Sequence, residues 1–212
     1  LTSQRYGFGT QISPDQSTDA KRYENLDLFS FVAASRYANT LIADGFGTDE
    51  PRFSCNVNIQ SSKEAFDLIK DLATVMRCMT IWSSGSITIS QDSPRDPSYL
   101  FSLANITSEG FNYTGSSLKQ RNTVISVSYL NMDSREIDYE IVGDDVTGPN
   151  ALQEDIDRQA KFGIVKKDIK AFACTSRGQA RRLGKAILLS EESETEVINF
   201  STSIEAGAIV RP

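Results

Sequence analysis

The sequence of 212 residues contains no histidine. Histidine is the general base of Ser-His-Asp and Cys-His hydrolases and the commonest metal ligand in proteins. These catalytic schemes and histidine-based metal sites are therefore excluded. The three cysteines, Cys55, Cys78 and Cys174, lie far apart and form no C-x-x-C pair, so they do not match a zinc site. We expect them to be buried free thiols.

Long apolar runs and an excess of positive charge are also missing. No run approaches the roughly 20 apolar residues that cross a bilayer. Lysine and arginine number 22 against 28 acidic residues, which gives a net charge of −6. Tight binding to DNA depends on clustered basic side chains that release counterions, so this class of binding is not expected. Because the sequence opens at Leu1 rather than at methionine, we expect a piece of a longer protein.

The first half of the chain alternates between helical and extended patterns. Apolar residues at the 3.6-residue period predict a helix over residues 28–42, and strict alternation predicts a strand over 52–60. Residues 61–64, Ser-Ser-Lys-Glu, match a capping box that begins a second helix. Residues 79–82 and 86–90 then predict a hairpin around Ser84-Gly85. This order indicates a β-α-β-β unit.

Residues 92–97 contain two prolines and three charges, which favour a boundary between lobes 1–97 and 98–212. In the second lobe, apolar periodicity predicts a hairpin of strands 123–130 and 137–142, followed by a strand at 163–173. A helix at 177–191 begins after the capping box Ser176-x-x-Gln179, and a strand at 195–204 follows it. Residues 151–160 fit a short helix or an ordered loop. The expected fold class is α+β: a small mixed sheet with packed helices, and a β-rich, barrel-like lobe.

Clustered carboxylates are the remaining candidates for catalysis. These clusters are Asp144 with Asp145, Glu154 with Asp155 and Asp157, and Asp92 with Asp96. Each lies in a polar, turn-like stretch without the apolar neighbours that raise a carboxyl pKa, so we expect solvated loop charge. Calcium at Asp155 and Asp157 would lack the EF-hand ligand pattern. The chain also lacks a phosphate-binding loop, and we expect no catalytic residue, metal or cofactor.

Two other functional classes stay open as alternatives. A carboxylate-dependent cell-wall hydrolase would need two acidic side chains facing each other across a groove. A carbohydrate- or receptor-binding module would need exposed aromatic side chains. The aromatic candidates are Trp82, Tyr99, Phe101, Phe111 and Tyr113, most of which have the pattern of core or hairpin residues.

A basic stripe departs from the usual charge preference of helices. Arg177, Arg181 and Lys185 recur at i, i+4 and i+8, with Arg182 alongside, and begin at the positive end of the helix dipole. Each exposed charge in the terminal turn is unfavourable by about 0.3–1 kcal/mol. The stripe is either a solvated face with a small tolerated cost, or a subunit interface that docks on an acidic surface of a neighbouring subunit.

Several short sequence motifs resemble those of the phage host-specificity protein J family, also called the tail tip attachment protein family. They are residues 52–56, 71–73, 79–82, 115–119 and 174–180, and the resemblance extends over most of the chain. The resemblance implies a segment of a phage or prophage tail tip hub, related to baseplate hubs and usually a homotrimer. Such a hub is a structural protein of the virion, assembled in the host cytoplasm.

The resemblance also implies what this hub does. It closes the tail tube, connects the tube to the host-binding region, and contacts other tail-tip and tail-tube proteins. From the acidic composition we expect DNA to pass through it without specific binding. The family offers no catalytic residues, so the resemblance implies a protein that is not an enzyme.

Overall fold

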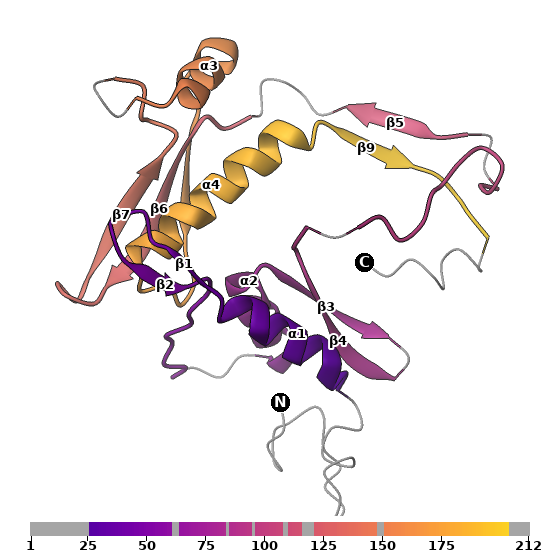
Figure 1. Cartoon of the computed structure of the whole chain (residues 1–212), viewed down its shortest axis with the longest axis horizontal. Helices are drawn as coiled ribbons and strands as arrows, with labels where there is room; N and C mark the ends of the chain where they lie inside the picture. Colours follow the sequence, from indigo (N-terminus) through magenta and orange to yellow (C-terminus); the bar gives the residue numbers. More distant parts are fainter. Residues whose placement is uncertain are drawn as a thin grey trace, which may run out of the picture. The chain divides into compact units, whose positions relative to one another are not determined.

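A computed structural model describes residues 26–60, 64–83, 85–94, 96–107, 110–115, 121–147 and 151–203 (Figure 1). The chain divides into two compact units, Leu1–Ser93 and Pro94–Pro212. Helices and small antiparallel or mixed sheets occur together, so the predicted α+β class is confirmed. None of the helices in these ranges is long and apolar enough to cross a membrane.

The first unit contains two helices and two hairpins in its described residues. In chain order they are α1 Leu28–Ala38, β1 Leu41–Ala43, β2 Asp49–Pro51, α2 Ala65–Val75, β3 Cys78–Ser83 and β4 Ser86–Gln91. The prediction of a helix reaching residue 42 is wrong, because the chain turns after Ala38 into the β1–β2 hairpin. Asp44 stabilises this turn: its carboxylate accepts hydrogen bonds from the backbone N–H of Phe46 and from the N–H and hydroxyl of Thr48.

The predicted strand at residues 52–60 is also wrong. The backbone N–H groups of Arg52 and Phe53 donate to the carbonyls of Thr40 and Ala38, at 2.9 and 3.1 Å, but no strand pairs with 52–60 in the described residues. Phe53 packs beside Tyr37, but Cys55, Val57 and Ile59 stay exposed in the absence of a neighbouring strand. The expected β-α-β-β unit therefore lacks its first strand in the described residues. Residues 61–63 of the predicted capping box lie outside the described residues.

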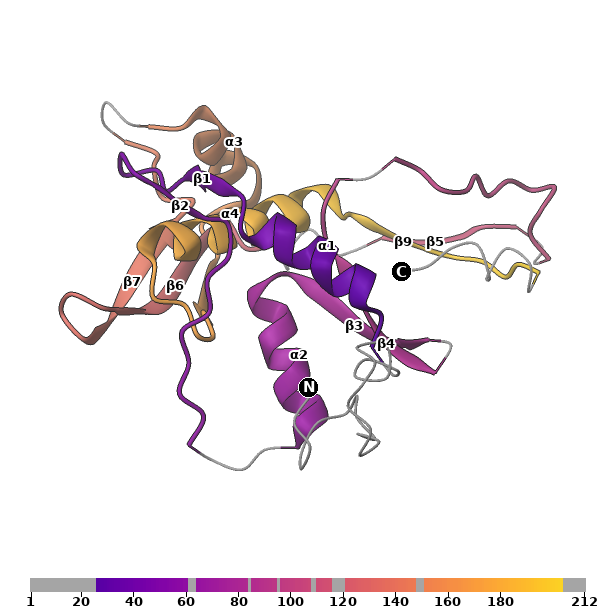
Figure 2. The same cartoon turned by 60° about the horizontal axis from the view of Figure 1, so that its bottom comes forward.

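The predicted hairpin that follows is confirmed as β3 and β4. The two strands pair antiparallel from Cys78↔Gln91 to Ser83↔Ser86, and Gly85 supplies the positive φ of +79° that a tight turn requires. Helices α1 and α2 pack beside this hairpin (Figure 2). Their contact buries Ala73 and Val75 of α2 and Ile87 and Ile89 of β4.

The second unit is built on a three-stranded sheet. Its elements are β5 Asn112–Gly115, β6 Val124–Asn131, β7 Glu136–Val142, α3 Gln153–Phe162, β8 Lys166–Lys170, α4 Arg177–Ser193 and β9 Glu196–Asn199. The sheet order is β7-β6-β8, with β7 antiparallel and β8 parallel to β6, while β5 and β9 form a separate two-stranded ribbon. The described strands form open sheets rather than a closed barrel, so the barrel-like feature that we expected is absent there.

Helix α4 covers one face of this sheet and forms the core of the unit. Ile125 and Val127 of β6, Val142 of β7, and Ala180 and Leu188 of α4 are almost completely buried together. The helix begins where the sequence predicts, because the hydroxyl of Ser176 accepts a hydrogen bond from the backbone N–H of Gln179 at 3.1 Å. The predicted helix at 177–191 and the hairpin of strands 123–130 and 137–142 are confirmed.

Two other segments of this unit are settled by the structure. Residues 151–160, for which helix and loop were both open, contain helix α3. The strands predicted at 163–173 and 195–204 are shorter, reduced to β8 and β9. Gly163, with a φ of +77°, ends α3 and displaces the start of β8 to Lys166.

Candidate subunit interface

Arg177, the first residue of the predicted basic stripe, pairs with a carboxylate of its own chain. Its Nε donates to Oε2 of Glu140 on β7 at 2.7 Å. The Glu140 side chain is buried, whereas that of Arg177 is 56% exposed. The hydrogen bond to Glu140 raises the pKa of the Arg177 guanidinium. Arg177 therefore supplies the positive charge that a buried carboxylate needs.

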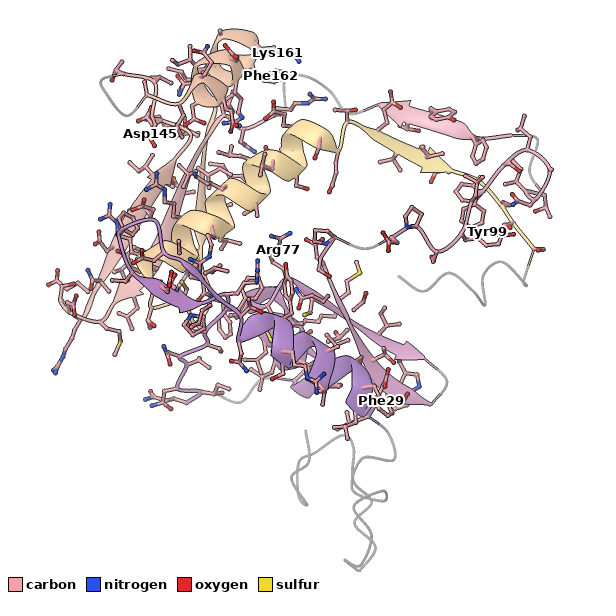
Figure 3. The ribbon with its side chains drawn as sticks, viewed as in Figure 1. Phe29, Arg77, Tyr99, Asp145, Lys161 and Phe162 are labelled. Carbon is pink, nitrogen blue, oxygen red and sulfur yellow. The ribbon has the colours of Figure 1, made fainter. Side chains whose placement is uncertain are left out.

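The rest of the stripe follows α4 towards its C-terminal half. Arg181 lies 3.6 Å from Asp145, measured from a guanidinium nitrogen to Oδ2, and Asp145 belongs to the loop after β7 (Figure 3). Arg182 is half-buried and Lys185 is exposed. These ion pairs offset the unfavourable interaction between basic residues and the N-terminal end of the helix. The role of the stripe as a subunit interface stays a prediction.

A shallow hollow lies beside the stripe. Its wall includes the charged side chains of Asp145, Arg181 and Lys185 and the apolar side chains of Leu152 and Leu189. The free volume is about 50 Å³, enough for a few water molecules and too small for a sugar or a nucleotide. The hollow is therefore too small to serve as a substrate pocket for either ligand.

A buried arginine that also lines the hollow connects α3 to α4. Arg158 donates from Nη1 to Oδ1 of Asp155 at 2.7 Å and from Nη2 to Oε2 of Glu192 at 3.1 Å. The side chains of Arg158 and Asp155 are only 6% and 8% exposed. The prediction of solvated loop charge is therefore wrong for Asp155, which lies in a buried ion pair. The sequence contains a signal for this ion pair that was not used in the prediction: Asp155 and Arg158 are three residues apart, so they lie on the same face of a helix.

Other candidate carboxylates also have partners in their own chain. Asp92 accepts a hydrogen bond from Nε of Arg77 at 3.2 Å, and Asp157 accepts one from Nε2 of Gln153 at 2.7 Å. In the described ranges, no three or more of the Cys, Asp and Glu side chains cluster as metal ligands would. Asp92 thus connects the end of β4 to Arg77, which follows α2, and Asp157 makes an i, i+4 contact within α3.

The cysteines differ from the expectation in one respect. Cys174 is buried and Cys78 partly buried, but Cys55 is exposed, because the segment around it has no strand partner. Burial, together with the negative charge of Asp92, raises the pKa of the Cys78 thiol to about 11. Partial removal from water also raises the pKa of the Cys55 thiol, although the residue as a whole is exposed. At neutral pH both are therefore protonated thiols rather than nucleophilic thiolates.

The aromatic candidates fall into two groups. Phe101 and Phe111 contact Phe200, and Tyr99 contacts Phe101, with neighbouring ring centroids 4.7 to 5.3 Å apart and the ring planes tilted or edge-on to each other. Sequence reasoning did not assign Phe200 to this small core. In contrast, Trp82 of β3 and Tyr113 of β5 are each 60% exposed.

Comparisons with known proteins find similar sequences among phage tail proteins. A family described as "Putative phage tail protein" matches residues 64–210. Tip attachment protein J of Escherichia phage SECphi27 is 34% identical over 97% of the chain, and tip attachment protein J of Escherichia phage SECphi4 is 28% identical over 96%. In both cases the chain spans 16% of the length of the relative.

Proposed function

The chain belongs to the phage tail protein family, and on this basis we propose that it is a structural segment of the tail tip hub of a phage or prophage. One observation carries the proposal: 97% of the chain aligns at 34% identity with a tip attachment protein J. The same match supports a location in the virion tail. Within the hub, the segment helps to close the tail tube and connects it to the host-binding region.

We propose a homotrimer as the assembly state, with other tail-tip and tail-tube proteins as further partners. A ring of identical subunits satisfies surfaces that a single copy leaves open, such as the edges of the three-stranded sheet. Assembly takes place in the host cytoplasm, before the virion is released. Because the net charge is −6, DNA passes such a ring without specific binding.

The proposed role is non-enzymatic. Asp92, Asp145 and Asp155 are each paired with an arginine of the same chain. A retaining or inverting glycosidase instead needs two carboxyl groups that face each other across a bound sugar. The ion pairs therefore favour a structural role for these side chains over a cell-wall hydrolase.

The stripe of Arg177, Arg181, Arg182 and Lys185 on α4 is proposed to contribute to the subunit interface, and the exposed Lys185 is the residue that tests it. Arg177 and Arg181 neutralise Glu140 and Asp145 within the chain, and so hold α4 in position on the sheet. Charge reversal by Lys185→Glu should weaken association, because it would place a carboxylate against an acidic neighbour. Glu194→Lys, at the exposed C-terminal end of the same helix, is the control for a general effect of charge.

Immunogold electron microscopy of purified virions tests the location. Antibodies raised against the 212-residue chain should label the distal end of the tail. Label on the capsid or along the tail shaft, or no label on virions that contain the parent protein, would overturn the proposal.

A receptor- or carbohydrate-binding module remains the second candidate, because Trp82 and Tyr113 are largely exposed. Exposed aromatic rings stack on the apolar faces of sugars. A glycan array probed with the chain separates the two functions. Binding that is lost in Trp82→Ala or Tyr113→Ala would favour the module over a purely architectural segment.

A further inference from the structure

Arg121, just before β6, has no carboxylate partner among the residues that the structure describes. Its guanidinium carbon lies 5.2 Å from the centre of the Phe162 ring, at the end of α3. Its Nε atom is buried and donates no hydrogen bond within the described residues. An unsatisfied donor on a charged group is costly, and native proteins contain few of them. The guanidinium of Arg121 therefore gains more from an anion than a guanidinium that is already paired.

A second cation lies against the same ring. The Nζ atom of Lys161 is 5.0 Å from the centre of the Phe162 ring, and Lys161 is exposed (Figure 3). The face of an aromatic ring attracts cations, but it does not supply the negative charge that would balance two of them. By contrast, Arg77, Arg158 and Arg177 each pair with a carboxylate of the chain.

Buried hydrogen bonds fix the two segments that carry these side chains. Thr123 is fully buried, and its hydroxyl donates to the carbonyl of Gly163 and accepts from the backbone N–H of Val165, both at 2.9 Å. The backbone N–H of Thr123 also donates to the carbonyl of Val165 at 2.9 Å. Phe162 directly precedes Gly163, so the ring and Arg121 extend from backbone that is held together. A site on such a backbone loses little conformational entropy when a ligand binds.

The carboxylate on the adjoining turn of α4 is already occupied. Glu191 accepts hydrogen bonds from the backbone and side-chain nitrogens of Asn122, the residue after Arg121, at 2.8 and 2.9 Å. It also pairs with Lys167 at 3.2 Å. These contacts use both oxygens of Glu191 and leave Arg121 without it.

We propose that Arg121 and Lys161 form a binding site for a single carboxylate, supplied by an acidic side chain of a neighbouring tail protein. This inference rests on the proposed tail-tip function. Guanidinium and ammonium groups donate to a carboxylate in charge-assisted hydrogen bonds, which are about twice as strong as neutral ones. A DNA strand fits less well, because binding to successive phosphates needs a row of basic side chains, and Glu191 adds negative charge beside Asn122 instead.

Nuclear magnetic resonance of the 212-residue chain tests the site, with sodium acetate as the carboxylate probe and sodium chloride at equal ionic strength as its control. Loss of a signal in Arg121→Lys identifies the Nε–H resonance of Arg121. Acetate should shift this resonance in a saturable way. Lys161→Gln should weaken the affinity about threefold or more, because one of two positive charges is lost. Lys170→Gln, at an exposed position of β8, is the matched control and should bind acetate like the wild type.

The backbone amide signals show whether each variant is folded. Equal responses of the Arg121 resonance to acetate and to chloride would overturn the site. A response to a DNA duplex without a response to acetate would assign the site to nucleic acid and would overturn the carboxylate as its ligand.

A second experiment tests the source of the carboxylate. In the parent phage, Arg121→Glu with Lys161→Glu should lower the number of complete tails about tenfold or more, because carboxylates then oppose a carboxylate. Lys166→Glu with Lys170→Glu makes the same change in net charge and is the control. A normal number of tails in the first variant would overturn a neighbouring tail protein as the source. The proposed tail-tip location fails or holds separately, because immunogold labelling tests it with the unmodified protein.

Discussion

At the scale of single residues, Gly184 controls how closely α4 approaches the sheet. A Cβ at this position would lie 2.9 Å from Cγ2 of Val142 and 3.2 Å from Cγ2 of Val127. Both valines belong to the core, where the surrounding side chains leave them little room to move. Glycine is therefore required by packing and not by backbone conformation.

Gly184→Val should destabilise the second unit by about 1–3 kcal/mol, because the added side chain overpacks the contact between helix and sheet. Lys185→Val is the control, since it introduces the same β-branched residue at the neighbouring, exposed position of the helix. Urea unfolding followed by circular dichroism measures both. Equal midpoints for the two variants would contradict the assigned packing role.

Glu191 connects the end of α4 to the start of β6. Its carboxylate accepts hydrogen bonds from the backbone N–H of Asn122 at 2.8 Å and from the side-chain amide of Asn122, and it pairs with Lys167 at 3.2 Å. Burial alone would raise the pKa of Glu191. The bonds from Asn122 and Lys167 outweigh burial, and the pKa is lowered from its ordinary value of 4.5.

A carboxyl group whose pKa is lower in the folded state than in the unfolded state stabilises the folded protein at pH values above the unfolded-state pKa. This stabilisation is lost as the pH falls through the folded-state pKa. Glu191→Gln should therefore cost about 1–3 kcal/mol at pH 7 and progressively less below the ordinary carboxyl pKa of 4.5. Glu194→Gln, at an exposed position, is the control. Urea midpoints across this pH range test the prediction, and a cost independent of pH would refute it.

At the scale of elements, the ion cluster of Arg158 decides how α3 is held. This short helix contacts α4 through the pair of Arg158 with Glu192, while Asp155 balances the same guanidinium from within α3. Gln159 adds a hydrogen bond from its side-chain amide to the carbonyl of Gly143 at 2.8 Å. The position of α3 thus depends on polar contacts that are partly or wholly removed from water.

Arg158→Met should destabilise the second unit by about 3–5 kcal/mol, because it leaves the carboxylate of Asp155 buried without a partner. The double variant Arg158→Met with Asp155→Leu should recover most of the loss, since it removes both buried charges. Lys161→Met, at an exposed position of the same helix, should be close to neutral. A double variant no more stable than Arg158→Met would mean that the carboxylate is not the source of the cost.

At the scale of the whole molecule, we propose that the lobes expected at 1–97 and 98–212 unfold as separate cooperative units. Trp82, the only tryptophan of the sequence, belongs to the first of them, so its fluorescence reports on that lobe alone. A domain with its own core is able to unfold on its own.

Gly184→Val should then shift the transition seen by circular dichroism and leave the Trp82 transition unchanged. Ile89→Ala, in the core of the first unit, should lower the midpoint of the Trp82 transition through a loss of about 2–5 kcal/mol. A shift of the Trp82 transition in Gly184→Val would show that the two lobes unfold together.

Local patterns in the sequence determined several elements correctly. The hairpin β3–β4, the hairpin β6–β7 and helix α4 with its Ser176 cap all follow from periodicity, turn residues and capping over short stretches of chain. The absence of histidine excluded whole classes of catalysis. The family resemblance, too, could be recognised from short words and is now supported by matches over most of the chain.

Only the tertiary structure decided which strands have partners and which charges are buried. Residues 52–60 alternate like a strand but belong to no strand of the described structure, whereas β8 pairs in parallel with β6, and β9 pairs antiparallel with β5. The sequence predicts that Asp155 is a solvated charge in a loop, whereas in the folded chain it is buried in an ion pair with Arg158. The physical reason is that periodicity reports the conformation of a few adjacent residues, while pairing and burial depend on segments that only the path of the chain brings together.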